Sequence, residues 1–349
     1  MRAEIAIAPP DSHPSCHASS ICETASGDLL VCCFAGQYEG APDQAILGAS
    51  LRHGEAGWSK PTIWVDVVNR AAGNPRVFRA PDGDGLWLVA PINYGAWCSG
   101  GTRLFLKRSY DEGREWSDLE LIDCPAGILG KNKPLIEQSL CILPVEYEVP
   151  WSACFLRTRD AGRSWEVCGN LGEEEGAHLI QPAIVRLQDR RLAAFMRSQE
   201  DWVFVSFSDD DGTSWSRPSV TPIPNNNSGI DVCLLRSGRL LLVCNPVASG
   251  DAPEKLDPAW PLAMPVSFDR WGQRTPLAVV VSEDGGVTWN QALRLEEGRG
   301  VYSYPAIMEG NDGAIHITYT HERTSIKHVE LSEEELVAGI EFASEEVTP

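Results

Sequence analysis

SDDDGTSW, at residues 208–215, is one of four copies of the octapeptide Ser/Thr-x-Asp-x-Gly-x-x-Trp in this chain. The other copies are SYDEGREW at 109–116, TRDAGRSW at 158–165 and SEDGGVTW at 282–289. Their aspartates, Asp111, Asp160, Asp210 and Asp284, follow one another at intervals of 49, 50 and 74 residues. A repeat of this length predicts an array of similar structural units rather than a fold without internal repeats.

The octapeptide, called the Asp box below, has the composition of a tight turn. Asp and Ser side chains can bond the backbone of the turn, and Gly supplies positive φ. We expect the Trp to fold back as an apolar plug and the aspartates to build turns rather than touch substrate. A spacing of about 45 residues fits one four-stranded propeller blade. Asp209–Gly212 superficially resembles a calcium loop, but the Glu required at loop position 12 is missing.

A second repeat runs out of phase with the first and supplies the inner strand of each unit. A polar residue, often followed by Pro, precedes a small or apolar pair, a turn and an apolar strand. Six copies predict an all-β fold, a six-bladed β-propeller with Asp-box turns in one domain over residues 1–330. The predicted blades are roughly 13–66, 74–123, 131–171, 178–223, 228–297 and 301–329. Glu4–Ile7 could pair into the last blade and close the ring, which removes two exposed sheet edges.

The C-terminal segment 331–349 is predicted to be a short acidic helix and tail. Ser332 and Glu335 form a capping box ahead of Leu336. The whole chain has a formal net charge of −20, which disfavours a nucleic-acid partner. An anionic small substrate stays compatible, because local cations can outweigh a distant acidic surface.

Cysteine usage and the N-terminus indicate where the protein works. The eleven cysteines form no CxxC pair, and most lie inside apolar runs. Buried free thiols are typical of a reducing cytoplasm. The N-terminus MRAEIAIAPPD lacks the apolar core of a secretory signal, and no apolar run of 18 residues predicts a membrane span. We therefore expect a cytoplasmic protein without disulfides or a membrane partner.

Polar residues of the second repeat should converge on one end of the propeller axis, because the first strand of each blade lines the central channel. The candidates on these strands are His17, Asn74, Arg76, Lys133, Gln181, Tyr302 and Tyr304. Arg197 and Arg274 flank neighbouring strands, and the loop 37–43 adds Gln37, Glu39 and Asp43. Arginines converging with tyrosines, a histidine and acids suit a sugar carboxylate, which Arg binds bidentately. No motif predicts a cofactor or a bound metal.

The Asp boxes, the six-fold period and this channel-lining set resemble the sialidase (neuraminidase) superfamily, specifically its bacterial BNR-repeat branch, over about residues 15–329. The resemblance implies that Asp43 is the acid/base and Tyr302 the nucleophile. It also implies that Arg197 and Arg274 hold the substrate carboxylate, with Arg76 or His17 as further candidates. Two positions depart from the family: His17 replaces its first arginine, and Gln181 replaces the glutamate that pairs with the tyrosine.

Each candidate also has a purely structural interpretation. In these interpretations Asp43 caps a turn, Tyr302 is a packed aromatic, and His17 is a core histidine. Either arginine pairs with an acid in the channel, and Glu39 is a solvated carboxylate. The long insertion at 248–275 fits a cover over a functional site as well as a neutral embellishment.

Three functions follow. The first is an exo-acting glycoside hydrolase that removes a terminal acidic sugar, sialic acid or a related 3-deoxy-ulosonic acid, from a glycoconjugate. The second is a polysaccharide lyase that cleaves at a uronate by elimination, for which a Tyr–His set such as Tyr302 with His17 is suitable and a Gln at 181 is no defect. The third is a non-catalytic carbohydrate-binding propeller.

Overall fold

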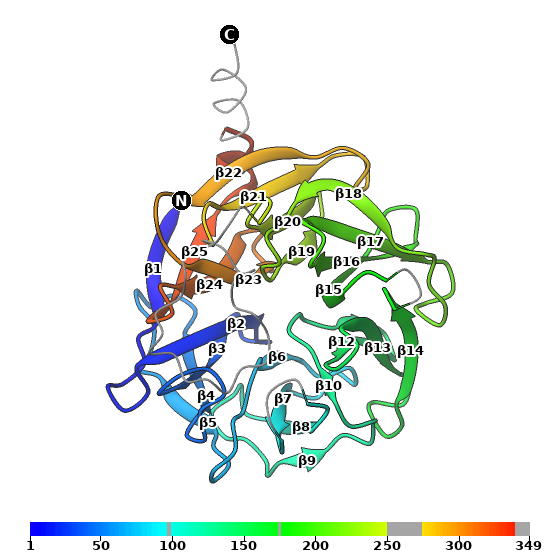
Figure 1. Cartoon of the computed structure of the whole chain (residues 1–349). Coiled ribbons are helices and arrows are strands. Elements are labelled where there is room, and N and C mark those ends of the chain that lie inside the picture. The colour runs from blue at the N-terminus through cyan, green and yellow to red at the C-terminus, as the bar shows by residue number, and fades with distance from the viewer. Residues whose placement is uncertain (96–98, 174–175, 250–273, 339–349) are drawn as a thin grey trace.

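The computed structural model of the chain is a ring of six antiparallel sheets, and it describes residues 1–95, 99–173, 176–249 and 274–338 (Figure 1). Blade 1 contains β2 (Ser15–Glu23), β3 (Leu29–Gly36), β4 (Ala45–Leu51) and β5 (Thr62–Val65). Blade 2 contains β6 (Arg76–Arg79), β7 (Leu86–Asn93), β8 (Thr102–Ser109) and β9 (Glu120–Leu121). Blade 3 contains β10 (Ile128–Leu129), β11 (Leu135–Glu137), β12 (Leu140–Tyr147), β13 (Ser152–Thr158) and β14 (Glu166–Leu171).

The second half of the chain repeats this plan. Blade 4 contains β15 (Leu179–Arg186), β16 (Leu192–Ser198), β17 (Trp202–Ser208) and β18 (Ser219–Pro224). Blade 5 contains β19 (Asp231–Leu234), β20 (Leu240–Cys244), β21 (Leu277–Ser282) and β22 (Asn290–Glu296). Blade 6 contains β23 (Tyr302–Glu309), β24 (Ile315–His321), β25 (Ser325–Leu331) and, from the N-terminus, β1 (Arg2–Ile7). The predicted six-bladed propeller is therefore confirmed.

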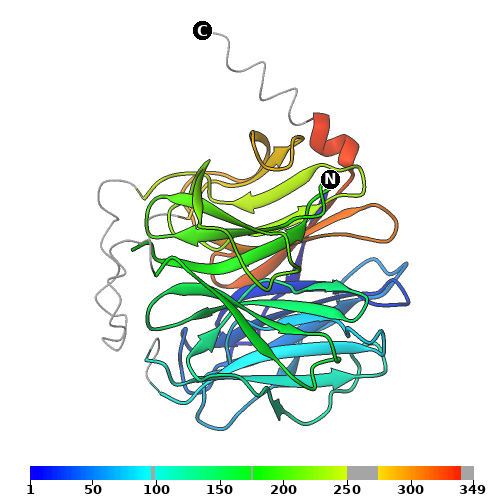
Figure 2. The ribbon, with the colours of Figure 1, turned by 90° about the vertical axis from the view of Figure 1, so that its right-hand side faces the viewer.

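The ring closes where the two ends of the chain meet. Strand β1 pairs antiparallel with β25, with Glu4 opposite His328, so the predicted closure through Glu4–Ile7 is confirmed. The α-amino group of Met1 also pairs with Glu335 of the short helix over residues 333–338, and Figure 2 shows the N-terminus beside that helix. The capping box is present: the Ser332 N–H donates to Glu335 Oε2 at 2.9 Å, and the Glu335 N–H donates to Ser332 Oγ at 3.2 Å.

All four Asp boxes form the turn between the third and fourth strands of a blade. In the copy of blade 4, Ser208 Oγ donates to Asp210 Oδ1 at 2.8 Å, and the N–H of Ser214 donates to the same oxygen at 2.9 Å. Gly212 has φ of +79° and donates its N–H to Ser208 Oγ. Hydrogen bonds from Ser214 and Ser208 lower the pKa of Asp210 to about 2. The boxes build turns, as predicted.

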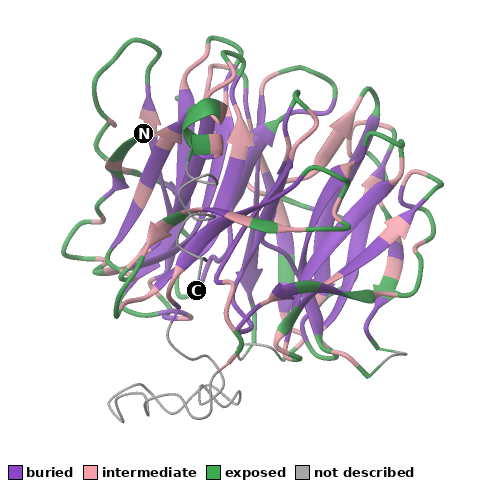
Figure 3. Cartoon of the chain, turned by 90° about the horizontal axis from the view of Figure 1, so that it is seen from above, coloured by how far each residue is buried: buried purple, intermediate pink, exposed green. Residues whose placement is uncertain are grey.

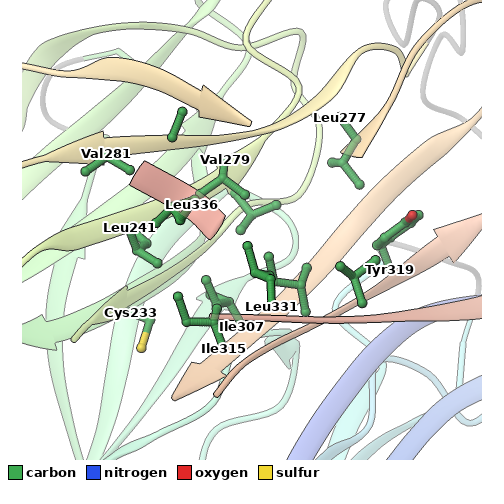
Figure 4. Close-up of a cluster of buried hydrophobic side chains, with 14 of the residues drawn as sticks. Cys233, Leu241, Leu277, Val279, Val281, Ile307, Ile315, Tyr319, Leu331 and Leu336 are labelled. Atoms are coloured by element: carbon green, nitrogen blue, oxygen red, sulfur yellow. The ribbon is translucent and has the colours of Figure 1, made fainter. Parts of the chain in front are cut away.

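The box tryptophans join each blade to the one before it. Trp215 of blade 4 stacks on Phe155 of blade 3, with ring centroids 4.1 Å apart, and Trp289 of blade 5 meets Phe195 of blade 4 edge-on at 5.7 Å. Most strand residues are buried, and the exposed residues lie mainly in the loops (Figure 3). Figure 4 shows the apolar cluster between blades 5 and 6, to which the fully buried Leu336 of the C-terminal helix is added.

Candidate functional site

Inner strands begin on one end of the ring, called the entry face below. Because the strands of a blade alternate in direction, turns between second and third strands lie on the entry face, and the Asp boxes lie on the opposite face. Near the start of five inner strands, one residue has a left-handed backbone: Ala18, Asn74, Gln181, Asn227 and Tyr304, with φ between 26° and 61°. In β2, β15 and β23 this residue lies at a break in the pairing register. The break interrupts the alternation of side chains that an ordinary strand would show.

Tyr304 lies at the centre of the arrangement. Its hydroxyl oxygen accepts hydrogen bonds from Arg197 Nη1 at 2.8 Å and from Gln181 Nε2 at 3.1 Å. The His17 ring centroid is 4.0 Å from that of Tyr304. Blades 6, 4 and 1 thus meet through these four side chains, and blades 1 and 4 are opposite one another in the ring, so the group lies on the propeller axis. The guanidinium carbon of Arg274 is 5.4 Å from the Tyr304 ring centroid. These four side chains and Arg274 are called the axial cluster below.

Gly229 allows the close approach within this cluster. A Cβ atom at this position would be 3.0 Å from Tyr304 Cδ2 and 3.3 Å from Gln181 Oε1. Contacts this short force a neighbouring group to move. A side chain at position 229 would therefore disturb the pair formed by Tyr304 and Gln181.

Several buried cations surround the cluster. Arg197 and Arg274 are 2% and 3% exposed, and burial lowers the pKa of Arg274 to about 10. Lys131 Nζ lies 5.9 Å from the Tyr304 ring centroid. A buried group of like charges is costly unless an anion accompanies it. The electrostatics of the entry face therefore favour an anionic ligand, even though the whole chain carries a net negative charge.

His17 is held in its neutral form. Burial lowers its pKa well below the usual range, and the charges of Arg323, Arg274, Arg197 and Lys131 add to this effect. Its Nδ1 lies 2.8 Å from Thr320 Oγ1, while Nε2 is buried and has no hydrogen-bond partner among the described residues. An uncharged imidazole cannot replace an arginine as a cation, but it can accept or relay a proton.

Tyr304, and not Tyr302, lies beside Arg197 and Gln181, where the resemblance led us to expect Tyr302. The Tyr302 side chain belongs to the apolar cluster between blades 5 and 6 and lies beside His321, with ring centroids 5.2 Å apart. Burial and a hydrogen bond with Glu322 raise the pKa of Tyr302. The left-handed backbone at Tyr304 and the register break between Ser303 and Ala306 explain why the second tyrosine, and not the first, reaches Arg197.

The acidic residues of the loop 37–43 are on the entry face, between β3 and β4. Asp43 is half-buried, and both its carboxylate oxygens lie 3.3 Å from the backbone nitrogen of Gln37, so it caps its own loop. Glu39 is buried and pairs with Arg323 at 2.6 Å. The Gln37 side chain donates to the Ser12 carbonyl. The loop thus brings Glu39, more directly than Asp43, to the cations of the site.

The remaining predicted residues support the walls of the channel. Arg76 is fully buried, and its Nη1 donates to the Pro144 carbonyl at 2.9 Å. Lys133 pairs with Asp231 at 2.7 Å. Asn74 is buried at the start of blade 2. The substrate-binding roles of these three side chains stay predictions. The insertion 248–275 falls almost entirely outside the described residues.

Two functional candidates were not singled out from the sequence. Arg323 is in the turn between β24 and β25, where Glu322 and Arg323 both have φ of 53°. Glu146 ends the apolar strand β12 and is 2% exposed; burial raises its pKa to about 7, although Arg76 and Arg197 oppose the shift. Neither residue belongs to a repeat motif, so only ring closure brings them to the axis.

The described residues also limit two other interpretations. No group of three or more His, Cys, Asp or Glu side chains within them is arranged to hold a metal ion. No helix in these parts of the chain combines the length and the apolar character needed to cross a membrane.

The sequence model of one family, described as the BNR repeat-like domain, matches residues 27–317. No curated protein matches the chain. Among solved structures, the Hadza microbial sialidase Hz136 superposes with a TM-score of 0.75 at 16% identity, covering 95% of this chain and 68% of that one. The intramolecular trans-sialidase from Ruminococcus gnavus, in complex with oseltamivir carboxylate, gives 0.70 at 15% identity, with coverage of 96% and 98%. A protein of unknown function from Dyadobacter fermentans gives 0.71 at 12%, with 95% and 98%. The TM-scores show a shared fold, and at these identities they show the fold alone.

Proposed function

Because this chain belongs to the family of BNR repeat-like domains, we propose that it is a sialidase-type glycoside hydrolase. Its substrate would be a glycoconjugate with a terminal acidic sugar, either sialic acid or a related 3-deoxy-ulosonic acid. The proposal depends above all on the Tyr304 hydroxyl, which is held between Arg197 and Gln181 on the propeller axis. The sialidases of similar fold support it.

Arg197 and Arg274 are the proposed carboxylate ligands. Both guanidinium groups are buried and lie 5.4 Å from the same tyrosine ring, measured from the guanidinium carbon to the ring centroid. A sugar carboxylate placed between them would receive charge-assisted hydrogen bonds, which are about twice as strong as neutral ones. A sugar carboxylate would match the positive charge of these two guanidinium groups, whereas a neutral sugar would not, so we expect specificity for an acidic sugar.

Tyr304 is the proposed group facing the anomeric carbon. A tyrosine that attacks this carbon must lose its proton, and the amide of Gln181 cannot take it. We therefore assign Tyr304 an electrostatic role: the phenol, positioned by Arg197 and Gln181, stabilises the positive charge of an oxocarbenium-like transition state without forming a covalent bond. Asp43 would protonate the leaving oxygen and then accept a proton from the attacking water, with Glu39 as the alternative acid on the same loop.

One observation favours elimination at a uronate as a second candidate. The neutral His17 and Tyr304 are in ring contact, with a centroid distance of 4.0 Å. Elimination needs a base for the C5 proton, an acid for the leaving oxygen and a neutralised carboxylate. His17, Tyr304 and the two arginines would supply these, and the Gln at 181 would then be no defect.

Product analysis separates the candidates. Wild-type protein is incubated with an aryl sialoside and, separately, with a uronate oligosaccharide, and products are followed by aryl release and by near-ultraviolet absorbance. Hydrolysis releases the aryl group without an unsaturated sugar, whereas elimination produces one. Tyr304→Phe should abolish the active reaction, while Tyr302→Phe, the matched control, should retain it. Binding of acidic sugars with neither product would leave the carbohydrate-binding propeller as the function.

We also propose that the protein acts in a reducing cytoplasm. All ten cysteines in the described part of the chain are free thiols, and all of these except Cys124 are buried. Cell fractionation of the native host would test this location, and recovery of the protein outside the cytoplasm would contradict it.

A further inference from the structure

The inner strand of blade 3 is interrupted at the propeller axis. Strand β10 pairs with β12 at Glu146 and Tyr147, and β11 pairs with it at Leu140–Ile142. Five residues, 130–134, therefore face only three residues of β12, 143–145. Pro144 has no N–H to donate to an inner strand, and its carbonyl is taken by Arg76. The segment 130–134 therefore does not pair with β12, and its residues can hydrogen-bond to other blades.

Lys131 and Asn132, in this segment, reach across the ring to three other blades. Asn132 Nδ2 donates to the carbonyl oxygens of Gln181 at 2.9 Å and Pro182 at 3.1 Å. Lys131 Nζ bonds Asn132 Oδ1 at 3.0 Å, the Ile230 carbonyl at 3.3 Å and the Pro305 carbonyl. Both side chains are buried. An ammonium group has three protons, and each has an acceptor here.

Two of these bonds end on the backbone at the centre of the site, at Gln181 and at the residue that follows Tyr304. Asn132 bonds Gln181 itself, and Lys131 bonds the residue directly after Tyr304. Gln181 and Tyr304 have φ of 52° and 55°, a region that costs backbone energy for residues other than glycine. Such strain persists only where the surroundings hold it in place.

We propose that Lys131 and Asn132 form a clamp that positions the Gln181–Tyr304 pair, and that the clamp is complete only while Lys131 carries all three protons. They are positioning residues, since neither touches the substrate in the proposed reaction. Loss of the clamp would let Tyr304 move away from Arg197. The kinetic part of this inference rests on the proposed function, while the structural part does not.

The charges around Lys131 make the clamp sensitive to pH. Burial lowers the pKa of Lys131 to about 7. Lys133 and Arg197 lower it further, while the carboxylate of Asp231, bonded to Lys133, opposes the shift. The Tyr304 ring also faces the ammonium group, and the buried, neutral His17 lies close enough to feel its charge. Above about pH 7 the neutral amine has two protons for three acceptors, so one bond of the clamp is lost.

The test uses the full chain and three variants: Lys131→Met, Asn132→Ala and, as matched control, Lys107→Met. Lys107 also donates to a backbone carbonyl, that of Trp64, but lies on β8 away from the axis. Hydrogen–deuterium exchange is measured for peptides covering 179–186 and 302–309, together with kcat and KM on an aryl sialoside across about pH 5–9. Thermal melting confirms that each variant is folded.

Both clamp variants should increase exchange in the two axial peptides, while Lys107→Met should not. Wild-type kcat should fall as pH rises through about 7, and Lys131→Met should lose this dependence. Its kcat should fall on the order of 100-fold with KM nearly unchanged, because a misplacement of about 1 Å costs this much.

If neither clamp variant changes exchange in the axial peptides relative to Lys107→Met, the inference is overturned. The same holds if Lys131→Met keeps the wild-type kcat and pH profile. If Lys131→Met does not fold, Asn132→Ala decides by the exchange at 179–186. If wild type releases no sugar but both clamp variants show the exchange change, the clamp stands and only the proposed hydrolase function fails.

Discussion

Replacing Gln181 by Glu tests directly what the axial pair does. In the wild type, Gln181 Nε2 lies 3.1 Å from the Tyr304 oxygen, and Gln181 Oε1 is buried without a hydrogen-bond partner among the described residues. A glutamate in the same rotamer would place a carboxylate oxygen within hydrogen-bonding distance of the phenol. Tyr304 could then donate its proton, and covalent attack on the anomeric carbon would become accessible.

The expected change in kcat of Gln181→Glu follows from two opposing effects. A positioned general base contributes typically about 10²–10⁴-fold to a rate. Burying a carboxylate at a position that is 4% exposed costs several kcal/mol by itself, on the order of 3–5 kcal/mol if the charge is unpaired. Arg197, bonded to the same phenol oxygen, and Arg274 offset much of this cost. We expect Gln181→Glu to raise kcat on an aryl sialoside about 10–100-fold, or about 1.4–2.7 kcal/mol, with a lower melting temperature.

The assay is the release of the aryl group, with kcat and KM obtained separately. Gln181→Met, of similar volume and without a base, is the control and should not gain activity. Adding Tyr304→Phe to Gln181→Glu should remove the gain, because both residues act in one step. A folded Gln181→Glu protein with the wild-type kcat, or a gain that survives Tyr304→Phe, would refute the assignment of Tyr304.

Three further outcomes are expected. Arg197→Ala should weaken sialic acid binding by about 1.5–3 kcal/mol, or about 10–150-fold in Kd, because a hydrogen-bonded cation is lost. Calorimetry measures this Kd, with galactose as the neutral control. An unchanged Kd would count against the carboxylate site. Asp210→Ala should lower the free energy of unfolding, measured in urea, by about 1–3 kcal/mol, because turn hydrogen bonds are lost. It should leave kcat unchanged, because the Asp box is on the face opposite the site. A loss of kcat in the folded variant would contradict a purely structural role of the box. Acidification below about pH 6.5 should destabilise the fold, because burial lowers the pKa of His328 to about 3 and the unfolded chain binds a proton that the folded chain does not. Stability should therefore fall as pH drops from about 6.5 towards 3, and melting of His328→Gln should depend less steeply on pH; equal slopes would exclude His328 as the cause.

The fold could be predicted from the sequence because its signals are local. An Asp box closes within eight residues, and the Ser208–Asp210 bond and the positive φ of Gly212 depend on nothing outside the turn. The capping box at Ser332 is equally local. Ring closure by β1 was predictable because the alternation at Glu4–Ile7 supplies the missing strand of the sixth blade.

The site was only partly predictable, because it depends on register and on ring closure. Gln181, Arg197 and His17 do meet on the axis. The tyrosine that joins them lies two residues beyond the expected one, since a break in the β23 register shifts the alternation. In β15 and β23 a Pro follows the break, but the similar break in β2 at Ala18 is followed by Ser19 and has no such marker. Arg323 and Glu146 come to the axis from a hairpin turn and a second strand, and no repeat identifies either position.

The two departures from the sialidase pattern compensate each other in charge. The pattern has an arginine where this chain has His17 and a glutamate where it has Gln181, so one positive and one negative charge are absent together. His17 is buried among Arg323, Arg274 and Arg197, which keep it neutral, and a neutral amide at 181 leaves no carboxylate to balance a cation at 17. Restoring the glutamate alone would therefore add one negative charge beside Arg197 and Arg274. Their positive charge is what makes a buried carboxylate at 181 tolerable, and it is the same charge that we assign to the carboxylate of the substrate. A glutamate at 181 and an acidic sugar should accordingly compete for the charge of Arg197, so the kcat gained by Gln181→Glu should be accompanied by a higher KM.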